Sequence, residues 1–304
     1  MAPRSLLDVD DLTPEELSRV LDRAVGFREA LPSRDLLAGV PVLNLFFEAS
    51  TRTATSFTLA EQRVGADIIS FAPGASSLGK GETIADTALT LRGIGVRAIV
   101  VRHPESGFAR RLADAFDGNV VNAGDGTHAH PTQALLDLMT LRQEFGRFEG
   151  LRVAIVGDIL HSRVARSNIV GMRMLGIDVT LVGPATLLPD GFAPAGVRIE
   201  RDLDALLPQL DAVMMLRIQR ERISAGLLPA LEDYTQRFQL NRVRLGLLRD
   251  DAVILHPGPY NRGVELTDDV LDDPRSRYVA QVHNGVFVRM AVLDFLVNGA
   301  PVPV

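Results

Sequence analysis

Cysteine is absent from the 304 residues of this chain. Its absence excludes disulfide frameworks, cysteine-ligated zinc, iron–sulfur clusters and thiol nucleophiles. No apolar run reaches the roughly 18 residues that a membrane-spanning helix needs, and the first ten residues lack the regions of a signal peptide. A net charge of −6 argues against a nucleic-acid-coating surface. These absences predict a cytoplasmic protein that binds neither a membrane nor nucleic acid.

Lysine is almost absent too: among 32 Lys and Arg residues, Lys80 is the single lysine. It lies between Gly79 and Gly81, in a loop of small residues. Lysine is a compact charge that can change its protonation state, whereas arginine is a rigid and permanent cation. The position of Lys80 therefore favours a functional role, and the alternative is a nucleotide bias that left one lysine by chance.

Apolar runs of strand length alternate with helical patterns along the chain. In the first half we expect strands at 40–47, 67–72, 97–102 and 119–122, with helices at 54–64, 83–94 and 107–116. In the second half we expect strands at 152–156, 178–182, 197–200, 212–216 and 252–255, with helices at 162–175 and 202–207. Apolar strands separated by helices are typical of parallel sheets covered on both faces. The predicted fold is α/β, with two doubly wound parallel-sheet domains joined by helices.

Three further helices set the domain organisation. Thr13, Pro14 and Glu16 form a capping box that begins a helix over 14–28. A long helix over 131–145 is interpreted as the connector between the halves, and a C-terminal helix is expected over 286–297. The predicted domains are residues 1–133, on which residues 285–304 pack back, and residues 134–284.

Hydroxyl groups and arginines follow the strands of the first half, where ligands of open parallel sheets bind. Ser50, Thr51, Arg52 and Thr53 come after the first strand, at a helix start. A helix cap needs one hydroxyl, so the surplus hydroxyls and the guanidinium favour a phosphate at the helix N-terminus. Arg102 closes a buried strand, which is costly unless it meets an anion; a surface ion pair is the alternative.

The fourth strand leads to His130 and Gln133, near the start of the helix over 131–145. Both side chains can donate hydrogen bonds to a carbonyl oxygen, which is oxyanion-type stabilisation. A metal site at His128 and His130 lacks a carboxylate at helical spacing. We therefore predict a carbonyl-polarising site and no metal.

Strand ends of the second half carry further cations. Arg163 begins a helix and Arg217 follows the strand over 212–216, so that two cations lie at two strand ends of one sheet, which suits a dicarboxylate. Gly157 after a strand hints at a dinucleotide fold, but Gly-x-Gly-x-x-Gly is absent. The prolines of the turn at 256–259 leave backbone carbonyls able to accept from an amide. A small acyl phosphate reacting with an amino dicarboxylate fits both halves.

Taken together, these motifs resemble the aspartate carbamoyltransferase family, of the aspartate/ornithine carbamoyltransferase superfamily. The resemblance is carried over residues 43–290 by Ser50-Thr51-Arg52-Thr53, Ser77-Leu78-Gly79-Lys80-Gly81-Glu82-Thr83, Arg102-His103-Pro104, His130-Pro131-Thr132-Gln133, Gly157-Asp158 through Arg163, Arg217-Ile218-Gln219 and His256-Pro257-Gly258-Pro259. It implies transfer of a carbamoyl group from carbamoyl phosphate to the amine of L-aspartate. The products would be N-carbamoyl-L-aspartate and phosphate, in pyrimidine biosynthesis, with no cofactor and no covalent enzyme intermediate.

The same resemblance implies a role for each matched residue. Carbamoyl phosphate would bind Ser50, Thr51, Arg52, Thr53, Ser77, Arg102, His130 and Gln133, with Gly258 and Pro259 contacting its amide through backbone carbonyls. Aspartate would bind Lys80, Arg163, Arg217 and Gln219. The catalytic residues would be Arg52, Thr53, Lys80, Arg102 and His130. Ser77 and Lys80 would reach in from a neighbouring subunit, which implies a homotrimer with shared active sites.

Departures from the family pattern leave the further partners open. Ala54 stands where many relatives have a second arginine, and Leu160 and His161 replace a Lys-Tyr pair of the enteric type. These differences indicate another branch, in which the partner could be a regulatory chain or a dihydroorotase-like chain.

Two rival functions remain to be weighed. Ornithine carbamoyltransferases share the phosphate half but use a cysteine in a His-Cys-Leu-Pro turn, which this chain lacks. Arg217 would repel the ornithine ammonium and attract a carboxylate. A non-catalytic subunit that only senses carbamoyl phosphate is disfavoured by the joint presence of Lys80, His130, Arg52 and Arg163.

Overall fold

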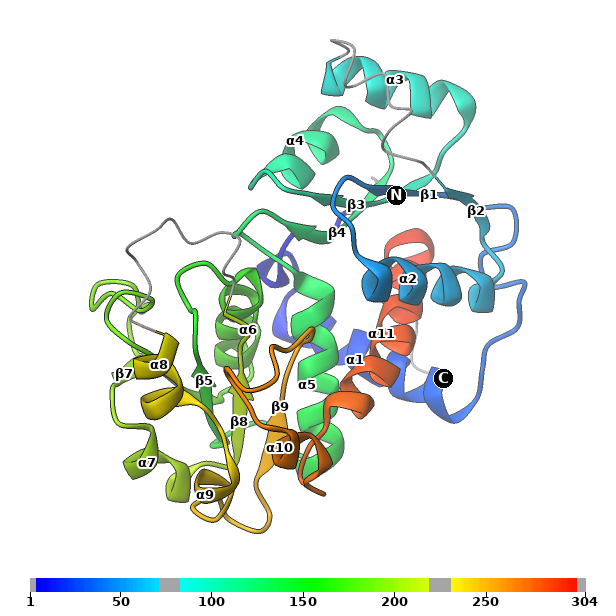
Figure 1. The fold of residues 1–304 in the computed structure, drawn as a ribbon. Coiled ribbons are helices and arrows are strands. Elements are labelled where there is room, and N and C mark those ends of the chain that lie inside the picture. Colours follow the sequence, from blue (N-terminus) through cyan, green and yellow to red (C-terminus); the bar gives the residue numbers. More distant parts are fainter. Residues whose placement is uncertain (1–3, 71–82, 219–230, 300–304) are drawn as a thin grey trace. The chain divides into compact units, whose positions relative to one another are not determined.

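The computed structural model describes residues 4–70, 83–218 and 231–299. The chain forms two compact units, residues 1–139 with 283–304 and residues 140–282 (Figure 1). Each unit has a parallel sheet whose strands alternate with helices along the chain. The predicted α/β class is therefore confirmed.

The first unit is built on a four-stranded sheet with the order β2-β1-β3-β4. Its strands are β1 (Pro41–Phe46), β2 (Asp67–Ser70), β3 (Ala98–His103) and β4 (Asn119–Asp125). Its helices are α1 (Pro14–Glu29), α2 (Thr51–Val64), α3 (Ile84–Ile94), α4 (Phe108–Ala115) and the short 3-10 helix η1 (Val9–Asp11). Two helices have residues in both units, α5 (Pro131–Phe145) and α11 (Tyr278–Asn298).

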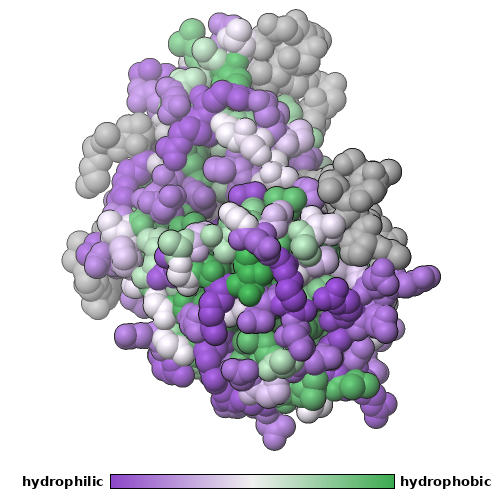
Figure 2. Space-filling model, turned by 90° about the vertical axis from the view of Figure 1, so that its left-hand side faces the viewer, coloured by the Kyte–Doolittle hydropathy of each residue, from purple (hydrophilic) through white to green (hydrophobic). Residues whose placement is uncertain are grey.

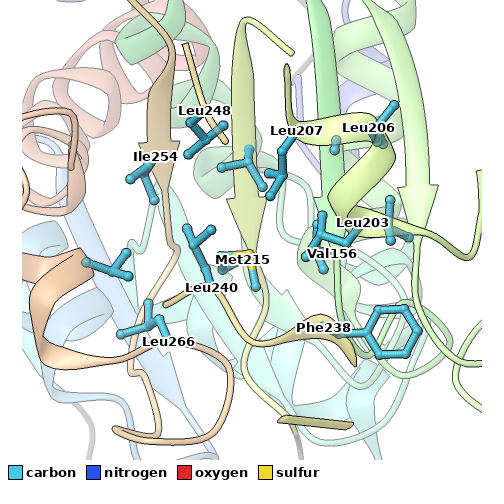
Figure 3. Packing of buried hydrophobic residues seen from close by; sticks show 14 of the residues in the cluster. Val156, Leu203, Leu206, Leu207, Met215, Phe238, Leu240, Leu248, Ile254 and Leu266 are labelled. Atoms are coloured by element: carbon cyan, nitrogen blue, oxygen red, sulfur yellow. The ribbon is translucent and has the colours of Figure 1, made fainter. Parts of the chain in front are cut away.

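The second unit has a five-stranded sheet with the order β7-β6-β5-β8-β9. Its strands are β5 (Arg152–Val156), β6 (Asp178–Val182), β7 (Arg198–Glu200), β8 (Ala212–Met215) and β9 (Val253–Leu255). Its helices are α6 (Arg163–Met174), α7 (Leu203–Leu206), η4 (Leu207–Gln209), α8 (Leu231–Phe238), α9 (Arg242–Leu245) and α10 (Asp268–Asp272). Strands β5, β8 and β9 and the helices beside them pack a core that includes Val156, Leu207 and Met215 (Figure 3).

Local sequence signals explain how two helices of the first unit begin and end. The predicted capping box is present in α1, where Glu16 N–H donates to Thr13 Oγ1 and Thr13 N–H donates to Glu16 Oε2. Helix α2 starts at Thr51, three residues before the predicted start, so the hydroxyl residues form its first turn. It ends at Val64, and the Gly65 that follows has φ +79°, where an added Cβ would lie 1.4 Å from the Arg34 carbonyl oxygen. Only glycine fits that position.

The outer surface agrees with the composition of the chain. The face drawn in Figure 2 is largely hydrophilic, with small separate hydrophobic areas. Within the described ranges, no helix has the length and apolar character required to cross a membrane.

Candidate active site

Residues predicted to hold a phosphate gather at one edge of the first sheet. The register pairs Phe46 of β1 with Arg102 of β3, and His103 with Asp125 of β4. Since the strands are parallel, the segments that follow β1, β3 and β4 leave the sheet at the same edge.

Helix α2 begins at this edge with the hydroxyl residues in its first turn. Ser50 is its N-cap residue and makes no side-chain capping bond. Thr51 and Arg52 are exposed, whereas Thr53 is buried. Arg102 Nη1 donates to Thr53 Oγ1 at 3.4 Å and to the Ala123 carbonyl oxygen at 3.5 Å. The structure thus brings Arg102 and Thr53 together.

Arg102 also forms an ion pair, and its partner Glu48 was not predicted from the sequence. Arg102 Nε donates to Glu48 Oε2 at 3.1 Å, and the two side chains are 14% and 19% exposed. The ion-pair alternative therefore exists, but in a mostly buried setting rather than on the open surface. Glu48 lies two residues after β1, and this position beside a strand end was the available signal.

His130 and Gln133 lie at the start of α5, and both are buried. Gln133 Nε2 donates to Asp137 Oδ1 at 2.9 Å, one helical turn along α5. A buried amide held by a carboxylate keeps one orientation, which suits a group that polarises a carbonyl.

Asp125 ties the loop before His130 to the loop after β3. Its Oδ2 accepts from Gly107 N–H at 2.7 Å, and its Oδ1 accepts from Asn122 Nδ2 at 2.8 Å and Ala129 N–H at 3.1 Å. His128 Nδ1 lies 3.2 Å from Asp125 Oδ2. His128 is thus a loop residue beside a carboxylate. Asp125 is 1% exposed, and sequence reasoning missed its function as a holder of this loop.

A second buried cation of the first unit was also missed. Arg289 of α11 is 4% exposed, lies 4.9 Å from the Phe57 ring centroid, and its Nη1 donates to Ser56 Oγ at 2.7 Å. Burial, and to a lesser extent the nearby charge of Arg102, lower the pKa of the Arg289 guanidinium to about 9, while Asp137 acts in the opposite direction. Arg289 therefore adds positive charge close to Arg102.

The two arginines predicted for a dicarboxylate follow neighbouring strands of the second sheet, β5 and β8. The register pairs Val156 of β5 with Met215 of β8, and Leu216 N–H donates to the Val156 carbonyl oxygen at 2.8 Å. Arg163 is the first residue of α6 and is buried, behind a Ser162 cap that accepts from Ala165 N–H at 3.1 Å. Arg217 follows β8 and is partly buried.

The proline turn after β9 is held from two sides. Gly258 N–H donates to His256 Nδ1 at 2.8 Å, and His256 N–H donates to Gln281 Oε1 at 2.9 Å. Gly258 has φ +62°, and a Cβ there would lie 2.8 Å from the Tyr278 ring. The Gly258–Pro259 peptide bond is cis. The two hydrogen bonds and the close approach of Tyr278 to Gly258 hold the backbone of the turn in place.

Three predicted site residues, Ser77, Lys80 and Gln219, lie outside the described residues. In the part of the chain that the structure describes, no group of three or more His, Cys, Asp or Glu residues could hold a metal ion.

Comparison with known proteins identifies one protein family over most of the chain. The family model "Aspartate/ornithine carbamoyltransferase, carbamoyl-P binding domain" matches residues 4–143, and the "Asp/Orn binding domain" of the same family matches residues 149–296. Aspartate carbamoyltransferase catalytic subunits of Acidothermus cellulolyticus and Salinispora arenicola are 51% and 52% identical. Each alignment covers 97% of this chain, and 93% and 98% of the relative, respectively.

Solved structures of two activities share the fold. A Trypanosoma cruzi aspartate transcarbamoylase in complex with carbamoyl phosphate and aspartate has a TM-score of 0.85 at 29% identity, with 96% of both chains covered. An ornithine carbamoyltransferase from Thermus thermophilus also has a TM-score of 0.85, at 30% identity, with 97% of this chain and 99% of that chain covered. Similarity of fold alone therefore does not distinguish an aspartate carbamoyltransferase from an ornithine carbamoyltransferase.

Proposed function

The chain belongs to the aspartate/ornithine carbamoyltransferase family, and we propose how its residues transfer a carbamoyl group from carbamoyl phosphate to L-aspartate. Its activity is that of an aspartate carbamoyltransferase catalytic subunit, EC 2.1.3.2, acting in pyrimidine biosynthesis. The observation that carries the choice of aspartate is Arg217 at the end of β8, beside the strand that precedes Arg163. Two guanidinium groups attract two carboxylates and repel the side-chain ammonium of ornithine.

In the first unit, the phosphate binds at the N-terminus of α2. Backbone N–H groups and the helix dipole favour an anion there, and Ser50, Thr51, Arg52 and Thr53 surround that terminus. Arg102 adds a guanidinium at the same sheet edge, held in place by Glu48. Residues 1–133 with 285–304 form the proposed carbamoyl phosphate domain.

The carbamoyl carbonyl is polarised by Thr53, Arg102 and His130, with Gln133 beside them. The aspartate amine attacks the carbonyl carbon, and the resulting tetrahedral oxyanion accepts hydrogen bonds from these donors. The C–O bond to phosphate then breaks, while Arg52 and Lys80 stabilise the charge of the departing phosphate. The amine proton goes to that phosphate. Most of the rate comes from orientation and prearranged charge.

In the second unit, aspartate binds Arg163, Arg217 and Gln219, with Lys80 contributing from a neighbouring subunit. Residues 134–284 form the proposed aspartate domain. Gly258 and Pro259 accept from the carbamoyl amide through their carbonyls, for which the rigid turn is suited. A homotrimer with shared sites, and a regulatory or dihydroorotase-like partner chain, belong to the same proposal. The cytoplasmic location stays a prediction.

The test is an assay for the ureido product, with aspartate and ornithine offered side by side. With carbamoyl phosphate as the donor, the purified chain is expected to form product from aspartate and not from ornithine. Product from ornithine only would refute the assignment. Arg52→Ala should lower kcat by about a hundredfold or more, because it removes the charge that meets the phosphate. Arg198→Ala is the matched control, since Arg198 lies on β7 in an exposed pair with Asp178. Near-normal kcat in Arg52→Ala would overturn the role given to Arg52.

A further inference from the structure

A buried carboxylate sits behind the proline turn of the second unit. Glu265 is 0% exposed, and its Oε1 accepts from the Asn261 backbone N–H. Its Oε2 accepts from Asn261 Nδ2 at 3.3 Å, and His256 Nε2 lies 3.5 Å from Oε1. A buried carboxylate is costly unless N–H donors surround it. These groups therefore hold the loop that follows the turn in one place.

The histidine beside Glu265 has a defined tautomer. Gly258 N–H donates to His256 Nδ1 at 2.8 Å, so Nδ1 must be unprotonated and the ring hydrogen lies on Nε2. Nε2 is the ring nitrogen next to Glu265 Oε1, at 3.5 Å. The turn and Glu265 thus form one assembly of close polar contacts.

Asn261 extends this assembly to the segment that carries Arg217. Its Nδ2 also donates to the Ile218 carbonyl oxygen at 3.3 Å, across 43 positions of the chain. The ladder of β8 ends with Leu216 N–H, so this carbonyl lies beyond the sheet. This hydrogen bond holds the carbonyl of the residue that directly follows Arg217, and so ties the end of the Arg217 segment to Asn261.

We propose that Asn261 is a positioning residue for aspartate binding, whose side-chain amide connects Glu265 to the Arg217 segment and sets where the Arg217 guanidinium meets the substrate carboxylate. The proposal rests on the proposed function of this unit. It assigns Asn261 no contact with the reacting atoms. Its effect is on affinity for the dicarboxylate, because a cation held in place loses less freedom when the substrate binds.

The experiment compares Asn261→Ala with Gln239→Ala in the full chain. Asn261→Ala removes the Nδ2 contacts to Glu265 and Ile218 and keeps the backbone N–H. Gln239 is the matched control, because its Nε2 donates to the Gly263 and Val264 carbonyls of the same loop at 2.7 and 3.1 Å without reaching the Arg217 segment.

In Asn261→Ala the KM for aspartate should rise by about three- to tenfold, the loss expected when the one hydrogen bond that reaches the Arg217 segment is removed. The KM for carbamoyl phosphate should change by less than about twofold, since the phosphate binds through the first unit. The Kd of succinate, a dicarboxylate without the attacking amine, should rise in parallel. Gln239→Ala should leave all three constants unchanged. Asn261→Ser, which keeps a shorter donor, should lose less affinity and serves if the alanine variant misfolds.

Three results would overturn the proposal. One is an unchanged aspartate KM in both Asn261 variants, and a second is an equal rise in Gln239→Ala. The third is a lowered Tm with unchanged KM and Kd values, because it would leave Asn261 a merely structural residue. A wild-type chain that forms no ureido product would instead refute the proposed function, which is a separate outcome.

Discussion

Replacing Glu61 with glutamine tests how one buried carboxyl group affects the pH dependence of stability. Glu61 lies on α2 and is 0% exposed, and its Oε2 accepts from Asn44 Nδ2 of β1 at 2.6 Å. Burial raises the pKa of the Glu61 carboxyl from its ordinary value of 4.5 to about 7, although the Asn44 hydrogen bond acts in the opposite direction. Removal of the charged form from water is the physical cause.

The sign of the effect follows from proton binding. Between pH 4.5 and about 7 the folded state keeps the Glu61 proton, while the unfolded state loses it. The free energy of unfolding therefore falls as pH rises through this window, by about 1.4 kcal/mol per pH unit and by about 3 kcal/mol in all. Stability from this group is complete below the lower pKa and lost above the upper one. Glutamine cannot ionise and keeps an oxygen for Asn44, so the variant lacks this dependence.

The measurement is urea unfolding followed by far-ultraviolet circular dichroism, at steps from about pH 5 to about pH 8.5. The difference in unfolding free energy, Glu61→Gln minus wild type, should grow by up to about 3 kcal/mol across that range. Glu29→Gln, at the exposed end of α1, is the control and should follow the wild type. If the curves for Glu61→Gln and wild type run parallel, the carboxyl is not held protonated and the reasoning fails.

Two further predictions concern backbone fit and subunit assembly. Gly65→Ala should cost more than about 2 kcal/mol of unfolding free energy, since the new Cβ would lie 1.4 Å from the Arg34 carbonyl at φ +79°; an unchanged Tm would contradict it. Mixing inactive Lys80→Ala and Arg52→Ala subunits should restore partial activity if the proposed homotrimer shares its sites, because mixed trimers would then contain some intact ones. Mixed trimers verified by mass and still inactive would count against shared sites.

Much of the fold could be predicted because its signals are local. Apolar strand runs and capping residues act within a few positions, so the strands of both sheets and the start of α1 were expected close to where they lie. Helices α8, α9 and α10 were missed; α9 and α10 have only four and five residues, too few to show a clear periodicity. Helix α11 begins at Tyr278, eight residues before the predicted start. Its first turns were missed because apolar Val279 and Val282 lie on the exposed face, so that this part of the helix lacks an amphipathic pattern.

Contacts between distant positions could not be predicted in the same way. Arg289 and Ser56 are separated by 233 positions, and no periodicity in either segment indicates that they meet. Asn261 and Ile218 are 43 positions apart. The strand-end rule identifies where ligands bind, but it does not say which side chains hold the ligand-binding groups from behind.

Chemistry nevertheless restricts what those holders can be. Both proposed substrates are anions, so the groups that meet them are N–H and O–H donors, and the groups behind these must accept hydrogen bonds. Carboxylates are the strongest acceptors a side chain offers. Glu48 accepts from Arg102, Asp125 from the loops around His130, and Glu265 from the loop after the proline turn. Each lies at the end of a strand or in the segment that follows one, and each is largely or fully buried. An acidic residue that follows a strand is therefore a usable signal for a positioning residue when a neighbouring strand ends in arginine or histidine. This signal can be sought in the amino-acid sequence alone.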